Sequence, residues 1–121
     1  MDLYFSPLAC SMATRIALYE AGAQANYLEV DPKTKVVQKD GSDFRLVNPL
    51  GLVPTLRTDD GLVLTENAAI LQYVADRFPQ AGISTGPGMD RSRCINGCVS
   101  SAPNCTRDCS CRCSTGTRHP K

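Results

Sequence analysis

The sequence predicts an α/β fold in which a four-stranded mixed sheet packs against helices. Two observations lead to this prediction. Short apolar runs alternate with amphipathic helical stretches, and the segments follow the order strand, helix, strand, short helix, strand, strand, helix. The chain has 121 residues, 42% of them hydrophobic, which suits a single domain. Beyond Gly82 the pattern stops, and we expect a disordered or irregular tail.

The first half of the sheet is predicted from a strand-helix-strand unit. An apolar run over 1–5 predicts the first strand, and Ser11 opens a run of helix formers that Gly22 ends. A second strand is expected over 25–30, parallel to the first because the helix is long enough for a crossover. The polar region 33–48 is interpreted as a binding loop. The apolar face of the first helix is expected to contain Met12, Ile16 and Tyr19.

The second half is predicted from a hairpin followed by a helix. After a short helix near 43–47, apolar runs over 53–57 and 62–64 flank an Asp-Gly dipeptide, which is typical of hairpin turns. Thr65 is expected to cap a helix over 66–78. The order is that of a thioredoxin-like βαβ-ββα fold with helices on both faces of the sheet. The apolar face of the last helix is expected to contain Ala69, Ile70, Tyr73, Val74 and Phe78.

A single cysteine, Cys10, follows the first strand and lies at the start of the first helix. The unpaired N–H groups and the dipole of a first helical turn favour a thiolate. A lone cysteine is also often just a small buried apolar residue. Val53 and Pro54 stand at the head of a strand beside this helix. A cis bond between them would present the Val53 backbone to an extended peptide, and the alternative is an ordinary trans proline on an edge strand.

Charge and composition argue against several classes of partner. The 13 basic and 12 acidic residues give a net charge of +1 without any long run of one sign, so no nucleic-acid partner is expected. No apolar stretch is long enough to span a membrane, and the N-terminus lacks the features of a signal peptide. With Cys10 the only cysteine in the first 93 residues, we expect a reducing, cytoplasmic location and no membrane partner.

The last part of the chain contains the other six cysteines, between Cys94 and Cys113. Their separations of 3, 6, 3, 1 and 1 intervening residues, with His119 the one nearby histidine, match a zinc site poorly. A disulfide knot conflicts with the reducing character of the first 93 residues. We therefore interpret 81–121 as a linker and a frameshifted remnant. A cysteine codon read one nucleotide out of frame encodes leucine, methionine or valine. The first four of these cysteines are spaced by 4, 7 and 4 positions, like one face of a helix.

Four groups of residues, in this order and spacing, make residues 1 to about 80 resemble the N-terminal domain of a bacterial, beta-class glutathione S-transferase. The groups are Leu3-Tyr4-Phe5-Ser6-Pro7 with Cys10-Ser11, Asp31-Pro32-Lys33-Thr34-Lys35, Asn48-Pro49-Leu50-Gly51-Leu52-Val53-Pro54, and Leu64-Thr65-Glu66-Asn67-Ala68-Ala69-Ile70. The resemblance implies a detoxification transferase that conjugates glutathione to small electrophiles, with glutathione as co-substrate and no metal. It also implies a homodimer for the intact family. The family's second, all-helical domain is missing from this sequence, which leaves the activity of this chain alone open.

The resemblance also implies site residues. Cys10 would contact the sulfur of glutathione, often as a mixed disulfide, and Ser11 is the second catalytic candidate. Val53, next to Pro54, would pair its backbone with the cysteinyl unit of glutathione. For Ser11 the alternative is a residue that only helps to start the helix.

Three further residues are implied as glutathione ligands. Glu66 and Asn67 would hold the γ-glutamyl group at the start of their helix, and Lys35 would approach the glycine carboxylate. On the sequence alone, Lys35 is also read as a solvated lysine of an exposed loop. Alternatively, Glu66 interacts only with the positive end of the helix dipole, and the Asn67 side chain only forms a local hydrogen bond to the backbone at the helix start.

Two other functions remain open. Cys10 lacks a resolving cysteine three positions on, so glutaredoxin-like thiol-disulfide exchange would have to be monothiol, through a mixed disulfide with glutathione. The third reading is a non-catalytic domain whose cysteine-rich tail binds metal.

Overall fold

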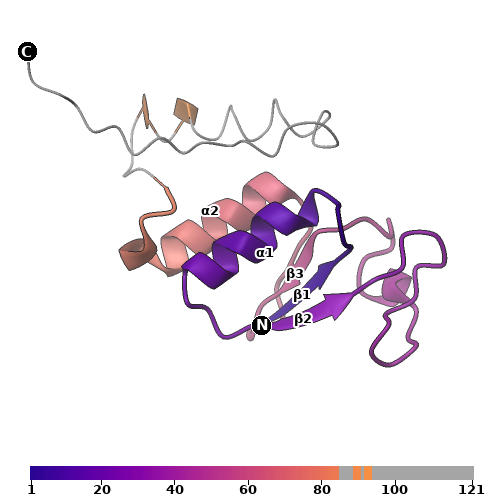
Figure 1. Cartoon of the computed structure of the whole chain (residues 1–121). Coiled ribbons are helices and arrows are strands. Elements are labelled where there is room, and N and C mark those ends of the chain that lie inside the picture. The colour runs from indigo at the N-terminus through magenta and orange to yellow at the C-terminus, as the bar shows by residue number, and fades with distance from the viewer. Residues whose placement is uncertain (85–88, 91, 94–121) are drawn as a thin grey trace, which may run out of the picture.

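The computed structural model describes residues 1–84, 89–90 and 92–93, and the predicted tail over 94–121 lies outside the described residues. Figure 1 shows a sheet with two α-helices side by side above it and a loop region beyond one end. The elements in chain order are β1 (Asp2–Phe5), α1 (Ser11–Glu20), β2 (Asn26–Glu29), the 3-10 helix η1 (Phe44–Leu46), β3 (Thr55–Arg57), β4 (Val63–Leu64), α2 (Asn67–Arg77) and the 3-10 helix η2 (Pro79–Ala81).

The sheet has four strands in the order β2-β1-β3-β4. β1 pairs with β2 in parallel, and β3 pairs antiparallel with both β1 and β4, so the predicted mixed sheet is confirmed. Asp2 on β1 links the neighbouring strands at one end of the sheet. Its carboxylate accepts hydrogen bonds from Asn26 on β2 and from Arg57 on β3, the latter at 2.6 Å. Burial alone would raise the pKa of Asp2, but the hydrogen bonds from Asn26 and Arg57 outweigh burial and lower it.

The two α-helices cover one face of the sheet, where the main core lies. Leu3 and Phe5 of β1 and Leu56 of β3 point to this face. The opposite face is covered by the loop after β2, which buries Phe44 of η1 against Tyr4, with the ring centres 5.2 Å apart. The prediction of helices on both faces therefore holds only in that η1 lies opposite the two α-helices. The core residues on the helical face are Leu3, Phe5, Ala17, Leu18, Leu56, Ile70 and Val74.

The predicted apolar face of α1 is wrong in two positions. Ile16 and Tyr19 are 55% and 56% exposed, and the buried stripe consists of Ser11, Thr14, Ala17 and Leu18. Two members of this stripe carry hydroxyl groups that are satisfied by hydrogen bonds, so an apolar pattern cannot reveal them. The stop at Gly22 is confirmed. The helix ends in a Schellman motif, in which Gly22 has a φ of +63°. The Gly22 N–H donates to the Tyr19 carbonyl and the Ala23 N–H to the Leu18 carbonyl.

The start of α2 differs from the prediction by one residue. Glu66, with extended backbone angles, is the N-cap, and Thr65 stands one position too early to cap the helix. Ile70, Val74 and Ala75 are buried, whereas the predicted core residue Ala69 is exposed. The remaining predicted core positions of this helix, Tyr73 and Phe78, are partly buried and pack against the core.

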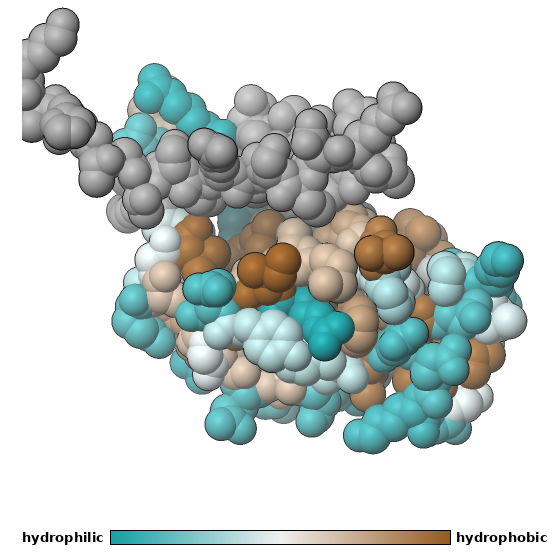
Figure 2. Space-filling view, viewed as in Figure 1, coloured by the Kyte–Doolittle hydropathy of each residue, from teal (hydrophilic) through white to brown (hydrophobic). Residues whose placement is uncertain are grey.

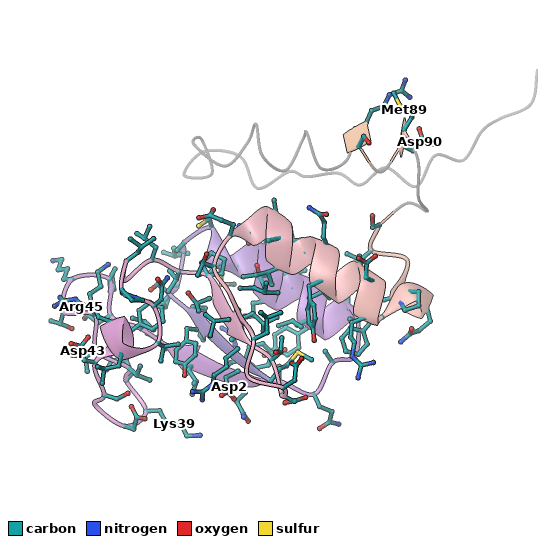
Figure 3. The ribbon with its side chains drawn as sticks, turned by 180° about the vertical axis from the view of Figure 1, so that it is seen from behind. Asp2, Lys39, Asp43, Arg45, Met89 and Asp90 are labelled. Atoms are coloured by element: carbon teal, nitrogen blue, oxygen red, sulfur yellow. The ribbon has the colours of Figure 1, made fainter. Side chains whose placement is uncertain are left out.

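The surface differs between the helical layer and the loop. In Figure 2, brown apolar side chains gather over the helices, and teal hydrophilic side chains dominate around the loop after β2. Lys39, Asp43 and Arg45 lie exposed at the loop end of the molecule (Figure 3), and the Asp43 carboxylate accepts a hydrogen bond from the Arg45 N–H at 2.9 Å. None of the helices in the described residues combines the length and the apolar character needed to cross a membrane.

Candidate active site

Cys10 is the N-cap residue of α1, at the end of a tight turn that leaves β1. The turn is fixed by Ser11, whose hydroxyl accepts the Ser6 N–H and donates to the Ser6 carbonyl, both at 3.1 Å. Ser11 is completely buried. Leu8, in the middle of the turn, adopts a left-handed conformation with φ of +58° and is 99% exposed. The turn thus places Cys10 at the first turn of the helix, as predicted, with Ser11 as its internal support.

The Cys10 side chain faces the segment before β3. Its Sγ lies 3.5 Å from the Val53 carbonyl oxygen. The Val53–Pro54 peptide bond is cis, the first of the two predicted alternatives. Among the described residues, no hydrogen-bond acceptor is recorded for the Val53 N–H. The structure therefore brings Cys10 and Val53 together.

The loop that carries Val53 is held by a buried asparagine. The Asn48 Nδ2 donates to the Leu52 carbonyl at 2.9 Å and to the Thr55 hydroxyl at 3.1 Å, and its Oδ1 accepts from the Leu50 N–H. Asn48 is 3% exposed. Asn48 belongs to one of the four groups that carry the family resemblance, but the sequence assigns it no functional role. It fixes the loop from the inside.

Lys35 lies beside a small cavity next to Val53. The cavity has a volume of about 130 Å³, and both Lys35 and Val53 line it. The alkyl part of Lys35 packs against Gly51, where an added Cβ atom would lie in ordinary contact with the Lys35 Cδ, at 3.4 Å. The residues lining the cavity are Ser6, Ala9, Val30, Pro32, Lys35, Gly51, Leu52 and Val53.

The turn before Lys35 is closed by Asp31. Its carboxylate accepts the N–H groups of Lys33 at 2.7 Å and Thr34 at 2.9 Å. The hydrogen bonds from Thr34 and Lys33 lower the pKa of Asp31. The Lys35 backbone, at a φ of +60°, then turns the chain back toward η1.

Asn67, the first residue of α2, contacts Cys10, and Glu66 precedes it as the N-cap residue. Glu66 is exposed, without a hydrogen bond from its side chain to the helix N-terminus. The Asn67 Nδ2 donates to the Cys10 carbonyl at 2.8 Å, and its Oδ1 accepts the Thr14 hydroxyl. The amide of Asn67 is thus turned into the protein, and the N–H groups of the first turn of α2 remain as donors at its N-terminus. Thr14 is a partner that the sequence does not signal, since it lies inside a helix.

The candidate site therefore lies where the first turns of α1 and α2 meet, beside the Val53 loop. Positive ends of two helix dipoles adjoin there, an arrangement that favours an anionic group such as a carboxylate. The structure places Cys10 next to Val53 and Asn67, and Lys35 in the lining of the same cavity as Val53. In the part of the chain that the structure describes, no group of three His, Cys, Asp or Glu residues is arranged to hold a metal ion.

The fold and the site define a thioredoxin-like domain with one cysteine at the start of its first helix and a cis-proline loop beside it. A family model described as the glutathione S-transferase N-terminal domain matches residues 9–77, more than half of the chain. The chain belongs to this family.

Relatives and solved structures agree with this assignment. The glutathione S-transferase GstA of Escherichia coli O157:H7 is 46% identical over 79 residues, which cover 65% of this chain and 39% of the relative. The glutathione S-transferase GST-4.5 of Xanthomonas campestris is 41% identical over 93 residues, 77% of this chain and 43% of the relative.

Among solved structures, a sphingomonad glutathione S-transferase complexed with glutathione matches with a TM-score of 0.75 at 45% identity, covering 79% of this chain and 48% of the other. BphK, a bacterial glutathione S-transferase in a ternary complex, matches with a TM-score of 0.79 at 41% identity, covering 84% and 51%. The chain spans about half the length of these proteins, or less.

Proposed function

We propose that this chain binds glutathione at the junction of α1, α2 and the Val53 loop, as the glutathione-binding part of a glutathione S-transferase. The observation that carries the proposal is the approach of the Cys10 Sγ to the Val53 carbonyl oxygen, at 3.5 Å. Cys10 faces the sulfur of glutathione. The Val53 backbone, next to Pro54, pairs with the cysteinyl unit in the manner of an added strand.

The two ends of the tripeptide are assigned to opposite sides of this centre. Glu66 and the backbone N–H of Asn67 receive the γ-glutamyl group at the N-terminus of α2. Lys35, which lines the cavity beside Val53, receives the glycine carboxylate. Ser11 acts as a positioning residue, because its hydroxyl is buried on Ser6.

The proposed reaction is conjugation. The glutathione thiol loses its proton to solvent, the thiolate attacks an electrophilic carbon, and a carbon-sulfur bond forms as the leaving group departs with its electron pair. Small electrophiles are the partners, and no metal is required. A homodimer and a cytoplasmic location remain predictions of the sequence and its family.

A second function is monothiol exchange through Cys10. It needs only the thiol and the glutathione site, whereas conjugation also needs an electrophile site. The cavity beside Val53 is lined by Lys35 and Val53, which are proposed to bind glutathione, so it does not serve as the electrophile site. Exchange proceeds by attack of the Cys10 thiolate on oxidised glutathione, which forms the mixed disulfide and releases one glutathione.

Glutathione binding can be tested by incubating the full chain with oxidised glutathione and mapping the adduct after trypsin digestion. Arg15 is the first basic residue, so the first tryptic peptide, 1–15, contains Cys10 and no other cysteine. We expect a glutathione adduct on this peptide and none on it in Cys10→Ala. A wild-type peptide that stays unmodified contradicts the proposal. Turnover of an aryl halide with reduced glutathione, compared with reduction of a mixed disulfide, then separates conjugation from exchange.

A further inference from the structure

The side chain of Asn67 joins the first turns of two helices that are far apart in the sequence. Its Nδ2 donates to the Cys10 carbonyl at 2.8 Å, and its Oδ1 accepts the hydroxyl of Thr14. Thr14 is completely buried. The nitrogen and the oxygen of the Asn67 amide therefore both form hydrogen bonds to the first turn of α1, one at Cys10 and one at Thr14.

We propose that Asn67 is a positioning residue for Cys10. Through its two hydrogen bonds, the Asn67 amide sets the position of the Cys10 thiol relative to the N-terminus of α2. This inference rests on the proposed function, in which the two helix starts hold different parts of one glutathione molecule. Cys10 would hold the sulfur, and the start of α2 the γ-glutamyl group.

The Cys10 carbonyl is a sensitive point at which to apply such a restraint. It already accepts the Ala13 N–H at 3.2 Å, a hydrogen bond of the first turn of α1. The second donor, from Asn67, holds the same oxygen from α2. Cys10 is the N-cap residue of α1, so a shift of its backbone would move the sulfur away from its place 3.5 Å from the Val53 carbonyl oxygen.

The hydrogen bonds of the Asn67 amide also offset an electrostatic repulsion between the two helix starts. The positive ends of the two helix dipoles lie side by side, an unfavourable arrangement in the absence of an anion. The hydrogen bonds of Asn67 hold the two helix starts together before the ligand carboxylate arrives. The site is thus assembled in advance, and binding does not have to bring the helices into place.

The test compares two reactions of Cys10 in the full chain, both read on tryptic peptide 1–15. One is modification by oxidised glutathione, which requires the sulfur and the start of α2 in register. The other is alkylation by iodoacetamide, a small uncharged reagent that requires only the sulfur. The ratio of the two rates is informative because a general loosening of the fold changes both rates together.

The variants are Asn67→Ala, which removes both hydrogen bonds, and Thr14→Val, which removes one. Thr14→Ser keeps the hydroxyl and serves as the conservative rescue. Asn26→Ala is the matched control, because the Asn26 amide also bridges two elements, donating to Asp2 at 2.8 Å, at the strand ends outside the proposed site.

We expect Asn67→Ala to lower the ratio of glutathione modification to alkylation by about tenfold or more, the scale on which misplacement of reacting groups slows a reaction. Thr14→Val should lower the ratio less, Thr14→Ser should restore it, and Asn26→Ala should leave it unchanged. If Asn67→Ala does not fold, as judged by circular dichroism, the comparison of Thr14→Val with Thr14→Ser decides.

The opposing outcomes are distinct. A wild-type chain that is modified by glutathione, with the same rate ratio in Asn67→Ala and Thr14→Val, overturns the positioning role and leaves the proposed function intact. A wild-type chain that takes up no glutathione at Cys10 overturns the proposed function, and the positioning role with it.

Discussion

Replacing Ser11 with alanine removes the hydroxyl that supports the turn before α1. Ser6, the residue that it serves, is 3% exposed, so its backbone groups have little access to water. The Ser6 N–H loses its recorded acceptor at 3.1 Å, and the Ser6 carbonyl keeps only a longer hydrogen bond from Ala9 at 3.4 Å. Leaving a buried donor such as the Ser6 N–H unsatisfied costs about 1–3 kcal/mol. Together with the weaker hydrogen bonding of the Ser6 carbonyl, the expected loss in the free energy of unfolding is about 2–3 kcal/mol.

Urea unfolding of the full chain, followed by far-ultraviolet circular dichroism, measures this loss. The chain has no tryptophan, so fluorescence is less suited to the purpose. With a denaturant dependence of roughly 1–3 kcal/mol per M, the midpoint should fall by about 1 M or more.

Ser42→Ala is the matched control for this substitution. The Ser42 hydroxyl also donates a hydrogen bond, to Asp40 at 2.7 Å, but Ser42 is exposed, and the expected change is within about 0.5 kcal/mol. A Ser11→Ala midpoint that matches that of Ser42→Ala would refute the reasoning, since the buried hydroxyl would then contribute no more than an exposed one.

Three other predictions concern the turn, the loop and the tail. Leu8→Gly should raise the free energy of unfolding by up to about 1 kcal/mol, and with it the urea midpoint. The reason is that a non-glycine residue in the left-handed region costs about 1–2 kcal/mol, while the exposed Leu8 side chain contributes no packing. A lower midpoint contradicts this. The N–H groups of Thr34 and Lys33 lower the pKa of Asp31 in the folded chain, so the unfolded chain binds a proton at this carboxylate more readily. The stabilisation is fully present above the unfolded pKa of about 3.9 and is lost as the pH falls through the lower pKa of the folded chain. Asp31→Asn should therefore unfold at lower urea at neutral pH, with the difference from wild type disappearing in acid; a difference that persists in acid opposes the assignment. Finally, the nucleotide sequence from codon 80 onward should contain a long open frame displaced by one base relative to that of 94–121, and early stop codons in that frame would exclude a frameshift.

The order and type of the elements could be predicted because their apolar patterns are regular. The helix stop at Gly22 and the Asp-Gly hairpin are local signals that do not depend on the rest of the fold. The buried stripe of α1 could not be predicted, because Ser11 and Thr14 are polar and become core residues only through hydrogen bonds to Ser6 and Asn67. Such bonds join distant positions and leave no periodic trace in the sequence.

The candidate site divides along the same line. The position of Cys10 follows from a strand, a turn and a helix start, and its approach to Val53 follows from the thioredoxin-like order of elements. The direction of the Asn67 side chain does not follow, since a residue at a helix start can face a ligand or a neighbouring helix. Only the packing of α1 against α2 decides that it turns inward.

The buried Asn48 has a consequence for the thermodynamics of binding. Its amide forms hydrogen bonds with Leu50, Leu52 and Thr55, so contacts within the protein hold the backbone on both sides of Val53. An extended peptide that docks there loses its own conformational freedom but needs little further ordering from the protein. Calorimetry of such a peptide should therefore show a smaller unfavourable entropy for the wild-type chain than for Asn48→Ala.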